Sequence, residues 1–274
     1  MDYHNWTKAA TPVLLQVELR LLTSLVVYHK PVLKNCDVKQ AFVQATLPED
    51  EVYFLKPPPG CPRSKPGEYW QLLRSLYGLK CASRLWFETM KAFLLSIGSR
   101  SCENHPCLFM GNLLDGEPPI YVGLFVDDLL YFSPSDTVEK HFETLLSQFV
   151  QVKFMGQVSH FLGIEFNCMF HDDGNLSVTL TLQSFAENLI DSLHFDFIQP
   201  SIYTTPYRSG FPVDAIPHVE MSSPDRDVLR LLYQSIVGSL NWFAHTTCPD
   251  LSTIVSMLAQ HQCNPSPGHL EAAH

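Results

Sequence analysis

Two adjacent carboxylates, Asp127 and Asp128, lie between two apolar runs rich in β-branched and aromatic residues, 120–126 and 129–132. Such runs are typical of strands, and their spacing predicts a hairpin with the two acids at its tip. A purely structural turn of this length favours Asn-Gly or Asp-Gly, because its central residues need positive φ, and no glycine is present here. Two ionised acids about 5 Å apart repel each other by roughly 3 kcal/mol at an effective dielectric of 20. A bound divalent cation would offset that repulsion, since Mg²⁺ prefers oxygen ligands.

A third acid, Asp37, is the natural partner for this pair. It lies near the end of another apolar run, residues 32–38, which also predicts a strand. Carboxylate sites of this kind commonly hold two divalent ions roughly 4 Å apart, which activate an attacking oxygen and stabilise a leaving one. The residues alone leave a second interpretation open, in which Asp127 and Asp128 form an ordinary polar turn. Turn chemistry favours the metal-binding pair.

Further elements are expected around these acids. Apolar residues recur at steps of three and four over residues 80–97, which predicts a helix, and a second helix is predicted to begin with Ser133 as cap and Pro134 as first helical residue. Further strands are expected over residues 52–55, 161–166 and 177–182, and helices over residues 228–243 and 251–261. Because strands and helices are mixed rather than strictly alternating, the pattern favours an α+β fold.

The composition is that of a folded chain. Apolar residues make up 46% of the 274 residues and charged residues 17%, which excludes disorder and coiled coil. No apolar stretch reaches the roughly 20 residues that a membrane helix needs. The first six residues show no targeting peptide, so we expect an intracellular protein with no membrane partner.

The cysteines argue against a disulfide scaffold or a zinc centre. None of the eight forms a CxxC pair, which favours reduced thiols. The closest cluster is Cys102, His105 and Cys107, but a structural zinc site needs four ligands, and no second pair stands at ligand spacing.

Charge is distributed unevenly along the chain. The net charge of −10 speaks against a polyanionic partner, yet residues 1–100 hold 13 of the 18 Lys and Arg and only 8 of the 28 Asp and Glu. Such asymmetry is typical of a surface that faces a polyanion, and an unevenly solvated surface explains it equally well.

Five motifs follow one another along the chain. They are Asp37-Val38-Lys39-Gln40-Ala41-Phe42, then Glu51-Val52-Tyr53 with Pro57-Pro58-Pro59-Gly60, then Ser75-Leu76-Tyr77-Gly78-Leu79-Lys80, then Phe125-Val126-Asp127-Asp128, and then Phe161-Leu162-Gly163-Ile164-Glu165. In this order they resemble the reverse transcriptase of copia-type LTR retrotransposons. The resemblance continues through residues 233–240 and 249–251, so it covers nearly the whole chain.

The resemblance implies an α+β right-hand polymerase of fingers, palm and thumb, with an antiparallel palm sheet. Asp37, Asp127 and Asp128 would be the palm carboxylates and, with the backbone carbonyl of Val38, would hold two Mg²⁺ ions, for which Mn²⁺ substitutes. The primer 3′-hydroxyl would attack the α-phosphate of a dNTP in line. The implied activity is RNA-directed DNA polymerase on an RNA or DNA template-primer.

The resemblance also implies substrate contacts. Phe42 would lie beneath the sugar of the incoming nucleotide and reject a 2′-hydroxyl, although by itself it is equally an ordinary core aromatic. Lys80 and Arg84 would reach the nucleotide and template, whereas with Glu88 they also make a solvated helix face with an i,i+4 pair. Lys153 resembles the lysine near the leaving pyrophosphate; otherwise it is a surface lysine.

Phe161, Leu162 and Gly163 resemble the primer grip, where the glycine permits close backbone approach; the alternative is a β-bulge. The chain departs from the family at Phe125, where tyrosine is common, and at Cys81-Ala82-Ser83-Arg84, where Gln-Ala-Pro-Arg is usual. The cysteine at position 81 puts the family's polar contact there in question. His105 also replaces an acid of the family.

The domain organisation expected from the resemblance has four parts. Residues 1–160 would form the palm and a part of the fingers that is incomplete at the N-terminus, and residues 161–199 the primer grip and the start of the thumb. Residues 200–225 are proline-rich and predict a linker. Residues 226–274 would form a short helical connection region that stops before any RNase H domain. The expected partners are template-primer, dNTP, and integrase and RNase H segments of one polyprotein, in cytoplasmic virus-like particles or the nucleus.

Two other functions are compatible with the sequence. A catalytically inactive or domesticated remnant would keep the fold and bind nucleic acid without polymerising. A two-metal phosphodiesterase would use the same acids to cleave rather than elongate.

Overall fold

The computed structural model describes residues 11–62, 65, 67–193, 213, 216–217, 219 and 222–273. The chain divides into two compact units: Met1–Phe161 with Cys168–Val178, and Leu162–Asn167 with Thr179–His274. One boundary between the units lies just before β10 (Ile164–Phe170), and the other two lie within β10 and within β11 (Leu176–Thr181).

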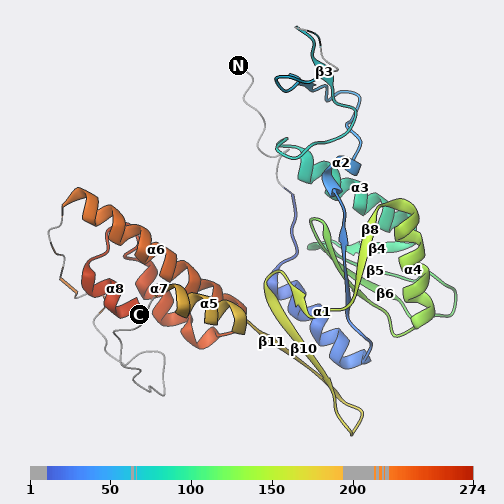
Figure 1. The fold of residues 1–274 in the computed structure, drawn as a ribbon. Helices are drawn as coiled ribbons and strands as arrows, with labels where there is room; N and C mark the ends of the chain where they lie inside the picture. Colours follow the sequence, from blue (N-terminus) through green and yellow to red (C-terminus); the bar gives the residue numbers. More distant parts are fainter. Residues whose placement is uncertain are drawn as a thin grey trace. The chain divides into compact units, whose positions relative to one another are not determined.

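A six-stranded sheet forms the centre of the first unit (Figure 1). Its strands, in spatial order, are β4 (Ser99–Cys102), β5 (His105–Gly111), β6 (Ile120–Phe125), β7 (Asp128–Phe132), β1 (Lys34–Val38) and β8 (Val152–Gln157). Every neighbouring pair is antiparallel. The prediction of a mixed fold with an antiparallel sheet is therefore confirmed.

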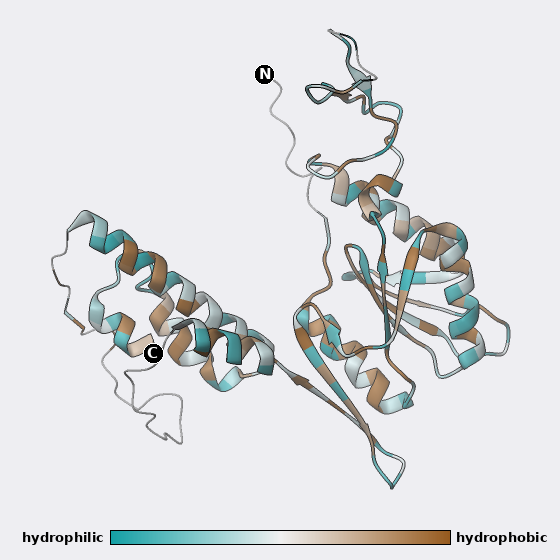
Figure 2. Ribbon diagram, viewed as in Figure 1, coloured by the Kyte–Doolittle hydropathy of each residue, from teal (hydrophilic) through white to brown (hydrophobic). Residues whose placement is uncertain are grey.

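One face of this sheet is covered by α3 (Ala82–Ser96) and α4 (Asp136–Phe149). The helix α3 carries the predicted apolar stripe, and α4 also buries one face. Figure 2 shows hydrophobic and hydrophilic residues alternating along α4. The buried stripes meet alternate residues of the strands in one core cluster, which includes Trp86, Val122, Tyr131 and Phe142.

The predicted start of α4 is two residues too early. Its N-cap is Ser135 rather than Ser133. The backbone N–H of Ser133 donates to Glu139 Oε1 and that of Ser135 to Ser133 Oγ, so side chains hold this segment in a turn before the helix begins.

The helix α1 (Gln16–His29) lies against the opposite face of the sheet and was not predicted. Leu19, Leu22 and Val26 are buried, but exposed apolar residues such as Val17 and Leu21 obscure the helical period. At Gly123 of β6 an added Cβ would lie 2.6 Å from Leu22 Cδ1. The close packing of α1 therefore requires a glycine there.

Three short elements follow β1. They are α2 (Ala41–Gln44), β2 (Phe54–Leu55) and β3 (Trp70–Gln71), and the last two pair in a small antiparallel ladder. The strand predicted over residues 52–55 is thus confirmed only at its end.

The strand predicted over residues 161–166 is interrupted. It is divided into β9 (His160–Phe161) and β10, because Leu162 and Gly163 have φ of 52° and 77° and turn the chain. With β11 these strands form a three-stranded sheet in the order β11-β10-β9.

The second unit is mainly helical. It contains α5 (Gln183–Leu193), α6 (Ser223–Thr246), the 3-10 helix η3 (Pro249–Leu251), α7 (Ser252–Ala259) and α8 (Pro267–Ala273). Tyr233 of α6 is buried in the core of this unit and donates a hydrogen bond to the carbonyl of Leu258 in α7 (2.7 Å). The two helices predicted after residue 226 are present.

The predicted linker, residues 200–225, lies mostly outside the described residues. Its last residues belong to α6, which begins five residues before the predicted start because Ser222 Oγ accepts the backbone N–H of Asp225 as a cap. Within the described parts of the chain, no helix is both long and apolar enough to cross a membrane.

Candidate active site

The antiparallel register brings Asp37 and Asp128 together. The two residues are direct Cα partners in the β1–β7 ladder, and Asp127 precedes Asp128 in the loop between β6 and β7. Cys36 and Val38 point into the helix-covered core. Because side chains alternate along a strand, Asp37 lies on the other face of the sheet, and the same argument places Asp128 there.

Across the sheet these acids form part of a continuous row. Phe125 of β6 pairs with Asp128, Asp128 pairs with Asp37, and Asp37 pairs with Lys153 of β8. The exposed Lys153 therefore brings a positive charge next to Asp37 on the same sheet face.

The carboxylates influence one another electrostatically. Partial burial, together with the negative charges of Asp127 and Asp37, raises the pKa of Asp128 to about 6. Like charges that face each other across a ladder destabilise it. The site thus has the unbalanced negative charge that a cation would neutralise.

The tight turn is one residue earlier than the sequence predicts. Its two loop residues are Val126 and Asp127, because Asp128 already pairs within β7. Val126 has φ of 53°, the left-handed region, which costs a β-branched residue about 1–2 kcal/mol.

Two hydrogen bonds hold this turn. The backbone N–H of Val38 donates to the carbonyl of Asp127 (2.8 Å), and the indole N–H of Trp86 on α3 donates to the carbonyl of Val126 (2.6 Å). Sequence reasoning placed Trp86 only in the apolar stripe of a helix. No sequence signal distinguishes its second role, because the contact depends on how α3 packs under the sheet.

The donor set fits magnesium better than a closed metal cage. Among the residues that the structure describes, no three His, Cys, Asp or Glu side chains are grouped closely enough to hold a metal ion by themselves. Mg²⁺ in phosphate-handling sites is usually bound by one or two carboxylates, with water and substrate phosphates as the other ligands. The facing pair Asp37 and Asp128, with the raised pKa of Asp128, fits that mode.

The residues Cys102, His105 and Cys107 occupy different environments. His105 Nδ1 lies 2.9 Å from Glu18 Oε1 at the start of α1, while Cys107 is buried and Cys102 is exposed.

Phe42 lies on α2, directly after β1. Its half-buried ring packs against the core and contacts the exposed ring of Tyr77, with the centroids 4.8 Å apart. Gln40, before the helix, has φ of 51°, so the chain turns sharply between Asp37 and Phe42. Phe42 therefore lies in the first turn of α2, close in the chain to Asp37.

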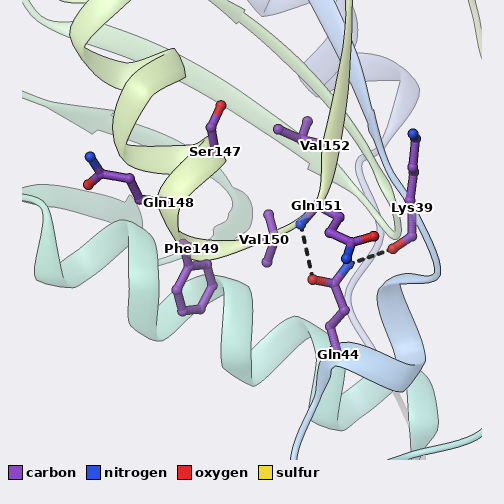
Figure 3. A pocket seen from close by; sticks show the side chains of 8 residues that line it. All are labelled: Lys39, Gln44, Ser147, Gln148, Phe149, Val150, Gln151 and Val152. Atoms are coloured by element: carbon purple, nitrogen blue, oxygen red, sulfur yellow. Dashed lines mark hydrogen bonds between the residues drawn. The ribbon is translucent and has the colours of Figure 1, made fainter.

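The side chain of Gln44 connects the end of α2 by hydrogen bonds to the residues next to β1 and β8. Figure 3 shows its amide between two backbone groups: Oε1 accepts the N–H of Gln151 (3.1 Å) and Nε2 donates to the carbonyl of Lys39. These residues line an open hollow of about 480 Å³ whose lining contains none of the three aspartates.

Arg84 is held by two carboxylates. Its guanidinium lies 2.6 Å from Glu51 Oε1 and 3.1 Å from Glu88 Oε2, so the i,i+4 pair is present, together with a contact to the loop before β2. Partial burial raises the pKa of Glu51, but hydrogen bonds from Tyr53 and Arg84 outweigh it, so this pKa lies below its usual value. The exposed Lys80 lies in the turn before α3.

The network extends to position 81. Cys81 Sγ donates to the hydroxyl of Tyr53 (3.4 Å), which in turn donates to Glu51 Oε2 (3.1 Å). In this structure the thiol at position 81 therefore takes part in a hydrogen-bond network with two other side chains of the chain.

The three residues that resemble a primer grip lie at a turn. Phe161 is buried at the end of β9, and Leu162 and Gly163 connect it to β10. Because the positive φ angles occur between two neighbouring strands, the local structure is a strand connection rather than a β-bulge.

Comparison with known proteins now identifies the family. Residues 1–207 match the family model described as reverse transcriptase (RNA-dependent DNA polymerase). A transposon Ty5-1 protein of Saccharomyces cerevisiae is 32% identical over 240 residues, which cover 86% of this chain and 72% of the yeast protein. Retrovirus-related Pol polyproteins from transposons RE2 and RE1 of Arabidopsis thaliana are each 28% identical over 98% of this chain, which spans 17% of their length. No solved structure matches. With the family model covering well over half of its residues, the chain belongs to the reverse transcriptase (RNA-dependent DNA polymerase) family.

Proposed function

We propose that this chain is the polymerase segment of a Ty/copia-type retrotransposon polyprotein and extends a DNA primer on an RNA or DNA template. The observation that supports it most strongly is the pairing of Asp37 with Asp128 across β1 and β7, with Asp127 adjacent in the turn that leads into β7. In a family of polymerases, this is the set of groups that nucleotidyl transfer requires.

In the proposed reaction, the primer 3′-oxygen attacks the α-phosphorus of a dNTP and pyrophosphate leaves. Asp37, Asp127 and Asp128 would hold two Mg²⁺ ions, with the Val38 carbonyl as a further ligand and Mn²⁺ as a substitute. Bound Mg²⁺ supplies Lewis acidity toward the hydroxyl and the phosphate oxygens. Without a bound cation the pKa of Asp128 is raised to about 6, and a bound Mg²⁺ ion would favour the ionised carboxylate.

The neighbouring residues would position the substrates. Phe42, in the first turn of α2 after β1, would lie beneath the sugar and exclude a 2′-hydroxyl. Lys153, paired with Asp37 in the sheet, would face the leaving pyrophosphate. Lys80 and Arg84 would contact the nucleotide and template, and residues 161–163 would contact the primer.

The same proposal assigns fingers, palm, thumb and a connection region to the chain. It also names virus-like particles as the place of action, and integrase and RNase H segments as partners. The six-stranded sheet with α3 and α4 would be the palm. The intact set of three aspartates supports an enzyme over an inactive remnant.

Primer extension on poly(rA)/oligo(dT) with dTTP and Mg²⁺ or Mn²⁺ tests the proposal. We expect the labelled primer to lengthen, and Asp37→Asn, Asp127→Asn and Asp128→Asn to prevent it. Asp172→Asn, an exposed acid between β10 and β11, is the matched control and should extend normally. A folded chain that leaves the primer unchanged contradicts the proposal, and one that shortens it supports a phosphodiesterase instead.

A further inference from the structure

Trp86 combines deep burial with one directed polar contact. Its side chain is 1% exposed within the core cluster under the sheet. The only polar atom of an indole is its N–H, which needs a partner when buried. Here the partner is the carbonyl of Val126, 2.6 Å away, in the turn that carries Asp127 and leads into Asp128.

Val126 has a left-handed backbone conformation, which valine disfavours. Its φ of 53° lies where glycine is normal and where a branched Cβ crowds the following carbonyl. Strained backbone of this kind persists only when the surroundings hold it.

The two peptide carbonyls of the turn are held from two different elements. Trp86 on α3 binds that of Val126, and the N–H of Val38 on β1 binds that of Asp127. The Val38 contact lies just beyond the last pair of the β1–β7 ladder and is made by two backbone groups. The Trp86 contact is made by a side chain from the helix layer, so it connects the packing of α3 to the orientation of the two acids.

From this geometry we propose that Trp86 is a positioning residue for Asp127 and Asp128. Its N–H fixes the Val126 peptide in the left-handed turn and so holds the two carboxylates toward Asp37. The inference rests on the proposed polymerase function. If the bond is lost, the peptide can rotate to relieve the strain at Val126, and a displacement of about 1 Å at reacting groups can cost about 100-fold in rate.

Trp86→Phe tests the proposal, because phenylalanine keeps an aromatic ring in the core and lacks the N–H. We expect kcat for primer extension to fall by about 10- to 100-fold, KM for dTTP to change by less than about 3-fold, and half-maximal activity to need more Mg²⁺. Amide hydrogen exchange over residues 125–129 should accelerate while the amides of α4 stay protected. Trp70→Phe, which changes a half-exposed tryptophan in β3, is the matched control and should change none of these.

A second variant separates the bond from simple packing. In Trp86→Phe/Val126→Gly, glycine adopts positive φ without strain, so kcat should recover at least about 3-fold over Trp86→Phe. The same double variant is used if Trp86→Phe alone does not fold, and it should then restore a cooperative unfolding transition. No recovery in either measurement overturns the proposal, as does a Trp86→Phe protein whose kcat and exchange match the wild type.

The failure of this proposal can be told apart from failure of the polymerase function. If the wild-type chain does not extend primers, the exchange experiment still tests the bond between Trp86 and the turn. If the wild type extends primers and Trp86→Phe does so equally, only the role of Trp86 is rejected.

Discussion

Asp37 and Asp128 lie directly opposite each other across β1 and β7, where two negative charges weaken the ladder that brings them together. Under the proposed function, a bound cation would offset this repulsion, and the lower stability of the ladder at this position would serve the chemistry of the site.

The first prediction concerns stability and pH without divalent cations. The folded-state pKa of Asp128 is raised to about 6, so the stabilisation linked to its protonated form is complete below pH 4 and is lost as the pH rises through 6. The Asp128→Asn variant should therefore be more stable than the wild type at pH 7, whereas at pH 4 the two should be equally stable. The difference should be on the order of 1–2 kcal/mol, allowing for solvent screening of a half-buried group. Urea unfolding at both pH values measures it, with Asp172→Asn as control, and an equal effect of Asp128→Asn at pH 4 and 7 would contradict it.

The second prediction concerns Asp127. Asp127→Asn should bring primer extension below detection while the urea midpoint stays close to that of the wild type, because the change removes a charge from a half-buried loop position and leaves the core untouched. Extension assays and circular dichroism on the same preparation check both parts. Retained extension would show that Asp127 is not a metal ligand.

The third prediction concerns sugar selection. Phe42→Ala should lower the preference for dTTP over UTP by at least about 10-fold, because the ring volume that would collide with a 2′-hydroxyl is removed. The ratio of kcat/KM for the two nucleotides measures it. Tyr77→Ala is the control, since it removes the ring that Phe42 contacts and leaves Phe42 in place. Unchanged discrimination in Phe42→Ala would make this residue an ordinary core aromatic.

The fourth prediction concerns the ion pair between Arg84 and Glu51. Their side chains are 19% and 24% exposed and meet at 2.6 Å, so a double-mutant cycle with alanine should give a coupling free energy of about 1–2 kcal/mol. The pair Arg84 and Glu88 is the internal control. Glu88 is 54% exposed, so that coupling should not exceed about 0.5 kcal/mol. Chemical unfolding of the single and double variants gives both coupling free energies. Equal values would show that the contact with Glu51 stabilises the fold no more than the contact with Glu88.

The sequence by itself determined the local elements whose periodicity is strong. The stripes of α3 and α4 and the apolar runs of β1, β6 and β7 are visible in order along the chain, because burial on one face imposes a spacing of 3.6 or 2 residues. The sequence also singled out the candidate site groups, because it shows a carboxylate pair without the glycine that a tight turn favours. Elements with irregular burial, such as α1, escaped this reasoning.

Only the tertiary structure decided which of these groups meet. The register that places Asp37 opposite Asp128, the position of the turn at Val126, and the contacts of Arg84 with Glu51 and of Trp86 with the turn all join residues far apart in the chain. A sequence pattern records which side of its own element a residue occupies. It does not record how one element is aligned with another, because that alignment is set by the packing of the whole sheet and its helices.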